Sequence, residues 1–191
     1  KQKILFVVHK LNQTNFVPIG IASLIGMLEA HGYTVHLVCP EQDNLNKEMD
    51  TYQPDVVGYS MLTGSHFQYL ETNRQLKARY EFISIFGGPH PTFFPEIIEE
   101  NGVDAVCLGE GEIALLEFLE KVGTTEVFRT QNFWIKHDGV IYRNPVRSLV
   151  ECLDDLPLPN YEIFYQKFLN LRDNPIKHFL VSRGCPYDCT Y

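Results

Sequence analysis

Two cysteines near the end of the chain have a spacing that could serve metal chemistry. Cys185 and Cys189 lie in the run Ser182-Arg-Gly-Cys-Pro-Tyr-Asp-Cys-Thr-Tyr191. Cysteine thiolate is a soft ligand that suits zinc and iron–sulfur clusters. Taken alone, the pair is also typical of half a zinc site or of two neighbours one turn apart on a helix. Three further cysteines stand in apolar or linker contexts and are expected to be inert thiols, namely Cys39, Cys107 and Cys152.

Hydroxyl and glycine residues follow three of the apolar runs in the sequence. Ser60 and Thr63 come after one run, Gly87-Gly88 after the next and Gly109-Glu-Gly-Glu112 after a third. Hydroxyls can hydrogen-bond a polar ligand, and glycines let a ligand lie directly against the backbone. These loops therefore favour a binding site for a small molecule.

The elements that must position these loops alternate between strands and helices. Apolar runs bounded by turn signals predict five strands, at residues 4–8, 34–38, 56–60, 82–86 and 105–108. Apolar spacing near 3.6 residues predicts helices at residues 19–31, 65–79, 95–101 and 113–122, with a weak helix within 41–53. Strands that alternate with helices form parallel β-α-β units. We therefore expect an α/β fold with a doubly wound, five-stranded parallel sheet, Rossmann-like or flavodoxin-like, over about residues 1–125.

Ligands of doubly wound sheets bind at the carboxyl ends of the strands, so the loops there decide between known site types. A response-regulator receiver domain needs acidic residues after the first strand and an aspartate after the third, where this chain has His9 and Ser60. A dinucleotide site needs G-x-G-x-x-G directly after the first strand, where no such pattern occurs. Gly109-Glu110-Gly111 contains G-x-G, but it follows the fifth strand, and its carboxylates would repel a pyrophosphate. The sequence therefore disfavours both site types.

The last third of the chain differs from the rest. Residues 133–136 and 140–143 flank His137-Asp138-Gly139, which predicts a β-hairpin added at the sheet edge. Residues 144–161 are rich in proline and acidic side chains and predict an extended linker, and a further strand is expected at 176–182. We therefore expect a domain at residues 1–143, a linker at 144–175 and the beginning of a second unit at 176–191.

Composition excludes two classes of partner. The 16 Lys and Arg residues face 24 Asp and Glu residues, for a formal net charge of −8, so nucleic acid is not an expected ligand. The apolar runs are too short to span a bilayer. The start of the chain lacks the pattern of a secretory signal, so a cytoplasmic protein is expected.

The loops that follow the strands resemble those of the cobalamin-binding domain family. That family has D-x-H-x-x-G after its first strand, S-x-L after the third and G-G after the fourth. Ser60-Met61-Leu62 matches S-x-L, and Gly87-Gly88 follows at close to the family's spacing. With Gly20 aligned to the last residue of the first motif, Asn15 and Val17 stand where the family has its aspartate and its cobalt-ligating histidine. The first motif is therefore absent.

The end of the chain resembles the C-x-x-x-C-x-x-C loop of radical S-adenosylmethionine enzymes, which is entered from the first strand of a barrel. Cys185 and Cys189 match its first two cysteines, and the third would occupy position 192. In that family three thiolates hold a 4Fe-4S cluster whose fourth iron binds S-adenosylmethionine. Together with Gly87-Gly-Pro-His-Pro-Thr92, Gly109-Glu-Gly-Glu112 and Asp155-Leu-Pro-Leu-Pro159, these motifs resemble the cobalamin-dependent radical S-adenosylmethionine superfamily. Its members include methyltransferases and enzymes similar to the anaerobic magnesium-protoporphyrin monomethyl ester cyclase.

The resemblance implies a cobalamin-binding domain of a larger enzyme, cut just before its cysteine loop is complete and not catalytic by itself. Residues 176–191 would begin the truncated radical S-adenosylmethionine barrel, and the rest of that domain would be the partner. Cobalamin would lie across the carboxyl ends of the strands. The residues implied to bind it are Ser60, Leu62, Thr63, Gly87, Gly88, His90, Gly109 and Gly111. Cys185 and Cys189 would ligate the 4Fe-4S cluster only in the complete enzyme.

Several roles stay open at this point. Because Val17 cannot ligate cobalt, the resemblance implies base-off cobalamin with no histidine beneath it. His90 lies between two prolines, where it either shapes the loop or ligates cobalt, and His9 is the other histidine near the expected site. Glu110 and Glu112 either cap the following helix or take part in catalysis. Two other functions remain alternatives: a vestigial domain that serves as a docking module, and a sensor of small molecules that uses the same crevice.

Overall fold

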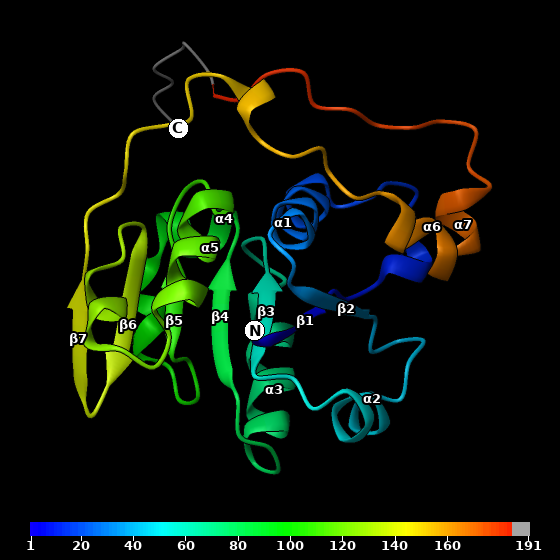
Figure 1. The fold of residues 1–191 in the computed structure, drawn as a ribbon. Helices are drawn as coiled ribbons and strands as arrows, with labels where there is room; N and C mark the ends of the chain where they lie inside the picture. The colour runs from blue at the N-terminus through cyan, green and yellow to red at the C-terminus, as the bar shows by residue number, and fades with distance from the viewer. Residues whose placement is uncertain (185–191) are drawn as a thin grey trace.

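A seven-stranded mixed sheet forms the centre of the structure (Figure 1). The computed structural model describes residues 1–184. The strand order is β2-β1-β3-β4-β5-β6-β7; the first five of these are parallel, and β6 and β7 are antiparallel. The strands are β1 (Lys3–Val7), β2 (Thr34–Val38), β3 (Val56–Ser60), β4 (Ile83–Gly87), β5 (Ala105–Cys107), β6 (Phe133–His137) and β7 (Val140–Arg143). The predicted doubly wound sheet with its edge hairpin is confirmed.

Helices connect the parallel strands close to where the sequence predicts them. The α-helices are α1 (Ile19–Ala30), α2 (Leu45–Tyr52), α3 (His66–Lys77), α4 (Pro89–Phe93), α5 (Glu112–Lys121), α6 (Glu162–Lys167) and α7 (Leu169–Arg172). The 3-10 helices are η1 (Leu11–Gln13), η2 (Pro95–Glu99), η3 (Thr125–Arg129) and η4 (Leu153–Asp155). Among residues 1–184 no helix is both long and apolar enough to cross a membrane.

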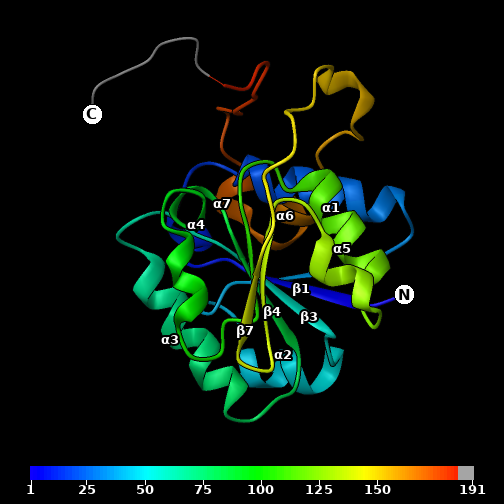
Figure 2. The same ribbon diagram turned by 90° about the vertical axis from the view of Figure 1, so that its left-hand side faces the viewer.

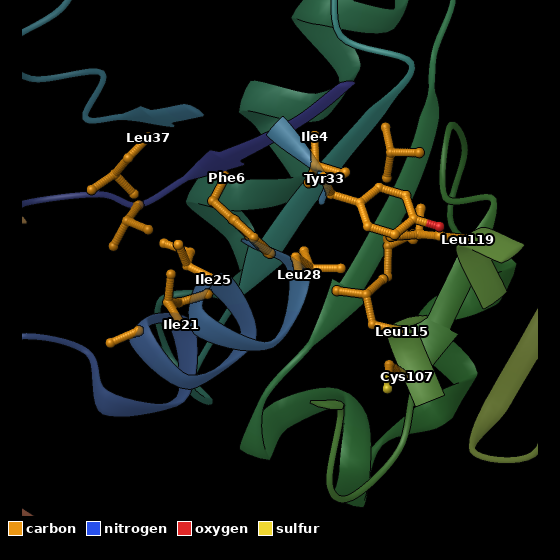
Figure 3. Close-up of a cluster of buried hydrophobic side chains, with 14 of the residues drawn as sticks. Ile4, Phe6, Ile21, Ile25, Leu28, Tyr33, Leu37, Cys107, Leu115 and Leu119 are labelled. Carbon is orange, nitrogen blue, oxygen red and sulfur yellow. The ribbon is translucent and has the colours of Figure 1, made fainter. Parts of the chain in front are cut away.

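The sheet is covered on both faces (Figure 2). Side chains of β1 alternate between them: Ile4 and Phe6 belong to a core under α1 and α5, while Leu5 and Val7 belong to a second core on the face of α2 and α3. Figure 3 shows part of the first core. Burial on both faces explains why the parallel strands read as continuous apolar runs.

Three parts of the chain differ from the sequence-based expectation. The helix predicted at residues 95–101 is the 3-10 helix η2, and the loop before it folds into the short helix α4, because Pro89 fits the first turn of a helix. Within the expected linker, α6 and α7 bury Phe164 and Phe168 in the core beside α1. The strand expected at 176–182 is not found, since these residues have no strand partner in the described part of the chain.

Candidate functional site

A cavity of about 250 Å³ lies between α1, α5 and the carboxyl ends of the central strands. Its walls are largely apolar, and Ile4, Phe6, Ile21 and Leu115 contribute to them (Figure 3). Ser60, the last residue of β3, also lines the cavity and contributes a polar side chain to it. A largely apolar cavity with a few polar groups suits the apolar part of a small molecule that also carries polar groups.

Missing side chains create this space. A Cβ atom on Gly58 would lie 2.6 Å from the ring of Phe6, so glycine in the middle of β3 allows that ring to lie across the strand and form a wall. A Cβ atom on Gly87 would have no neighbour closer than 3.8 Å, and one on Gly20 would have none within 4 Å. Both glycines line the cavity, so their lack of a side chain leaves open space there.

Five of the eight residues that the resemblance implies are brought together here. They are Ser60, Gly87, Gly88, Gly109 and Gly111. The other three lie outside this cavity: Leu62 is 60% exposed, and Thr63 and His90 bond each other on the side of α3 and α4. The sequence places all eight after neighbouring strands, but only the packing separates them into two groups.

His90 belongs to a row of aromatic rings at the ends of β3 and β4. Its Nδ1 lies 3.0 Å from the Thr63 hydroxyl oxygen, and its ring stacks on His66 with 3.9 Å between the centroids. Phe67 and Phe94 extend the row at either end. Burial and the neighbouring His66 lower the pKa of His90, so a neutral ring is favoured. This environment is compatible with the loop-shaping role.

His9 is fully occupied by protein partners. Its Nδ1 lies 2.8 Å from the carboxylate of Glu41, and its Nε2 lies 3.0 Å from the hydroxyl of Thr72. Burial opposes ionisation of Glu41, but hydrogen bonds from the backbone of Lys10 and from His9 outweigh it and lower its pKa to about 2. His9 therefore ties together the loops that follow β1 and β2, and neither of its ring nitrogens is free.

A buried charge cluster beside the cavity was not anticipated from the sequence. Glu112 is the first residue of α5, and its side chain is only 6% exposed. Its Oε1 accepts hydrogen bonds from the Ser23 hydroxyl at 2.7 Å and from Arg183 Nη2 at 2.6 Å. Burial would raise the pKa of Glu112, but Arg183 and Ser23 outweigh burial and lower it. No motif spacing indicates this contact, because residues 112 and 183 are distant in the sequence.

The position of Glu112 partly agrees with the helix-cap interpretation of the two glutamates. A carboxylate in the first turn of α5 interacts favourably with the helix dipole. Glu110 instead accepts from the backbone N–H of Val150 at 2.9 Å and from Arg183 at 3.2 Å. Both carboxylates thus connect the start of α5 and the loop before it to later parts of the chain, Glu110 to Val150 and both to Arg183.

The cavity wall includes a buried thiol that is held in its protonated form. Cys107 lines the cavity, and burial together with Glu112 raises the pKa of this thiol to about 12. No group of three or more His, Cys, Asp or Glu side chains within residues 1–184 could hold a metal ion. Cys185 and Cys189 lie outside the described residues.

Sequence comparisons agree with the geometry. A family model described as "B12 binding domain" matches residues 7–119. The chain is 28% identical over 182 residues to an uncharacterized methyltransferase of Pyrococcus horikoshii, covering 91% of this chain and 40% of that protein. It is 27% identical over 195 residues to the anaerobic magnesium-protoporphyrin IX monomethyl ester cyclase of Rubrivivax gelatinosus, covering 93% and 35%. The chain thus spans well under half the length of these relatives.

Solved structures share the fold. The radical S-adenosylmethionine methyltransferase TsrM of Kitasatospora setae, with cobalamin and a [4Fe-4S] cluster bound, matches with a TM-score of 0.64 and 16% identity, covering 85% of this chain and 32% of that chain. The cobalamin-dependent S-adenosylmethionine radical enzyme OxsB matches with a TM-score of 0.66 and 18% identity, covering 85% and 24%.

Proposed function

The chain belongs to the B12-binding domain family, and we propose that it binds cobalamin with the nucleotide tail of the cofactor in the cavity between α1 and α5. The observation that carries this proposal is the lining of the cavity by Gly20 and Gly87, where an added Cβ atom would meet open space instead of protein atoms. The heteroaromatic base of the tail is flat and largely apolar, and its apolar faces match the largely apolar walls of the cavity. The corrin ring is too large for 250 Å³ and would lie outside, over the strand ends.

The surrounding residues have distinct roles in this arrangement. The Ser60 hydroxyl would bond a polar group of the tail at the cavity entrance, and Gly88 brings the backbone after β4 close to the same place. Leu62, Thr63 and His90 lie nearer to the aromatic row, where they would face the corrin side chains. Gly109 and Gly111 keep the wall at the start of α5 free of side chains.

We propose that the cofactor is bound base-off, with no histidine beneath cobalt. Val17 is buried in the core and offers only methyl groups, and both ring nitrogens of His9 are already bonded. Cobalamin held in this way supplies a low-valent cobalt that is strongly nucleophilic toward methyl groups. The contribution of this chain is to bind the cofactor and to exclude protein ligands from its lower face.

We further propose that the domain works within a larger radical S-adenosylmethionine enzyme, either a methyltransferase or a cyclase. The names of the relatives and the share of their length that this chain spans support this proposal. Residues 1–143 would form the cobalamin-binding domain, 144–175 a linker whose second half packs on that domain, and 176–191 the start of the catalytic domain. Cys185 and Cys189 would then ligate a 4Fe-4S cluster.

A docking module remains the second candidate because apolar side chains are exposed at the same edge of the sheet. Phe67, at one end of the aromatic row, is 71% exposed, and Phe93 of α4 is 77% exposed. Exposed groups of this kind are typical of contact surfaces. In this alternative the fold is retained and the cavity is not used.

The visible spectrum after incubation with hydroxocobalamin and removal of the free cofactor separates the two candidates. Cobalamin binding predicts close to one equivalent of retained cofactor with a base-off spectrum. Loss of all colour during desalting, from a protein with an unchanged circular-dichroism spectrum, would contradict the proposal and favour the docking module.

A further inference from the structure

Residues 176–184, called here the strap, pass above the carboxyl ends of the strands after α7, as the red part of the ribbon shows in Figures 1 and 2. Two of its residues, Leu180 and Arg183, line the cavity between α1 and α5. The other described residues of the cavity wall lie between Ile4 and Phe133, so the strap adds a segment from much later in the chain. The strap therefore forms an outer side of the proposed tail site.

Polar contacts at Arg183 hold the far end of the strap. Its Nη1 lies 3.2 Å from Oε2 of Glu112 while its Nη2 lies 2.6 Å from Oε1, which is the two-pronged arrangement that matches a guanidinium to a carboxylate. Arg183 also reaches Glu110 at 3.2 Å and the hydroxyl of Ser23 at 3.4 Å. These partners come from the start of α5, the loop before it and α1, so one side chain joins the strap to both helices beside the cavity.

Apolar burial contributes little to holding the strap. Phe179 is 73% exposed, Leu180 is 57% exposed and Val181 is 91% exposed. Edge contacts of His178 with Phe16 and of Phe179 with Tyr161 are loose, with ring centroids more than 6 Å apart at 6.2 and 6.1 Å. Lys177 ties the near end of the strap to the backbone carbonyls of Leu171 and Arg172. The buried carboxylate of Glu112 is the corresponding tie at the far end.

We propose that Arg183 and Glu112 form a latch that holds the strap against the cavity and slows the release of a ligand bound there. The inference rests on the proposed function for the identity of that ligand, but the latch itself does not need a ligand. Opening the latch would free the strap while the sheet and helices stay folded.

The variants Glu112→Gln and Arg183→Gln test the latch from its two sides. Glu112→Gln leaves an arginine that can turn toward solvent, whereas Arg183→Gln leaves a buried carboxylate without its cation, so the first variant is the milder one for folding. Arg172→Gln is the matched control, because it removes the same charge from an exposed pair with Asp173 on the helix before the strap.

Backbone mobility measures the latch without cofactor. In heteronuclear 15N relaxation of the 191-residue chain, the amides of residues 180–184 should become markedly more mobile in Glu112→Gln and Arg183→Gln, and stay as in wild type in Arg172→Gln. The double variant should be no more mobile than Arg183→Gln, since that single variant already removes the contacts of the guanidinium with Glu112, Glu110 and Ser23. Unchanged mobility in both single variants would overturn the latch.

Cofactor release measures its consequence. After loading with hydroxocobalamin, Glu112→Gln should release the cofactor about tenfold faster than wild type and Arg172→Gln, given the strength of a charge-assisted hydrogen bond. If the amides of residues 180–184 become more mobile but the rate of cofactor release does not change, the latch has no role in retaining the cofactor. If wild type retains no cobalamin, the proposed function fails, while the mobility result still decides whether the latch exists.

Discussion

A Cβ atom placed on Gly88 would lie 2.9 Å from the hydroxyl oxygen of Ser60 and equally close to the carbonyl oxygen of Met61. Gly88 also has a φ of +94°, which residues with a side chain rarely adopt. The two residues match the G-G and S-x-L motifs, and they touch because Ser60 pairs with Gly87 in the sheet. Gly88 is therefore required by the backbone conformation and by the close approach of Ser60 and Met61, whereas Gly87 borders open space.

The two glycines should consequently respond differently to substitution. Gly87→Val is expected to fold normally and to lower cobalamin affinity by about tenfold or more, because its side chain would occupy the cavity. Gly88→Val is expected to lose on the order of 1–3 kcal/mol of unfolding free energy through strain. Urea unfolding and retention of hydroxocobalamin measure the two effects, and Thr34→Val on the exposed end of β2 serves as the control. Full retention by Gly87→Val would place the tail elsewhere.

The lower face of bound cobalt should show no nitrogen ligand. Electron paramagnetic resonance of the Co(II) form reports this directly, since an axial nitrogen splits each high-field line into three. We expect no such splitting in wild type and the same spectrum in His9→Ala, which should instead lose on the order of 1 kcal/mol of stability with its bonds to Glu41 and Thr72. Triplets that disappear in His9→Ala or His90→Ala would identify that histidine as a ligand.

Glu41 should contribute to acid sensitivity. Its pKa in the folded protein is about 2 instead of the ordinary 4.5, because the bonds from Lys10 and His9 outweigh burial. A lowered pKa gives stability that is fully present above pH 4.5 and is lost as the pH falls toward 2. Cys39 and Gln68 also donate hydrogen bonds to the Glu41 carboxylate.

Unfolding free energies measured from pH 6 to pH 3 test this expectation. The difference between wild type and Glu41→Gln should be largest near pH 6 and should shrink below about pH 4.5 as the wild-type carboxylate takes up its proton. The exposed Glu81, changed to Gln, provides a surface control. A difference between wild type and Glu41→Gln that does not change with pH would show that the carboxylate is not stabilised by these contacts.

Removing the Tyr59 hydroxyl should stabilise the protein. This group is buried and has no hydrogen-bond partner among the described residues, and its ring stacks on Phe86. Tyr59→Phe is expected to raise the unfolding free energy by about 1 kcal/mol, because an unpaired buried hydroxyl is costly. Tyr69→Phe should act in the opposite direction, since its hydroxyl accepts from the backbone N–H of His9. A loss of stability in Tyr59→Phe would indicate an unseen partner such as a water molecule.

The sequence by itself determined the sheet and the loops at its carboxyl edge. Continuous apolar strands and intervening helical periods depend on local patterns, which is why both could be predicted. The strand order and the register that places Ser60 beside Gly87 came from the structure. The resemblance identified the family because its motifs lie in single loops. The short helix α6 was missed, since it is held by the burial of Phe164 in a distant core and has only six residues.

Only the tertiary structure decided where the cavity lies and which implied residues border it. The cavity exists because the ring of Phe6 crosses Gly58 and because α1 and α5 pack beside the strand ends, and these contacts join residues far apart in the chain. The same packing directs Thr63 and His90 away from the cavity. Arg183 meets Glu112 across 71 residues, and long-range electrostatic contacts of this kind follow from chain folding, which no local spacing records.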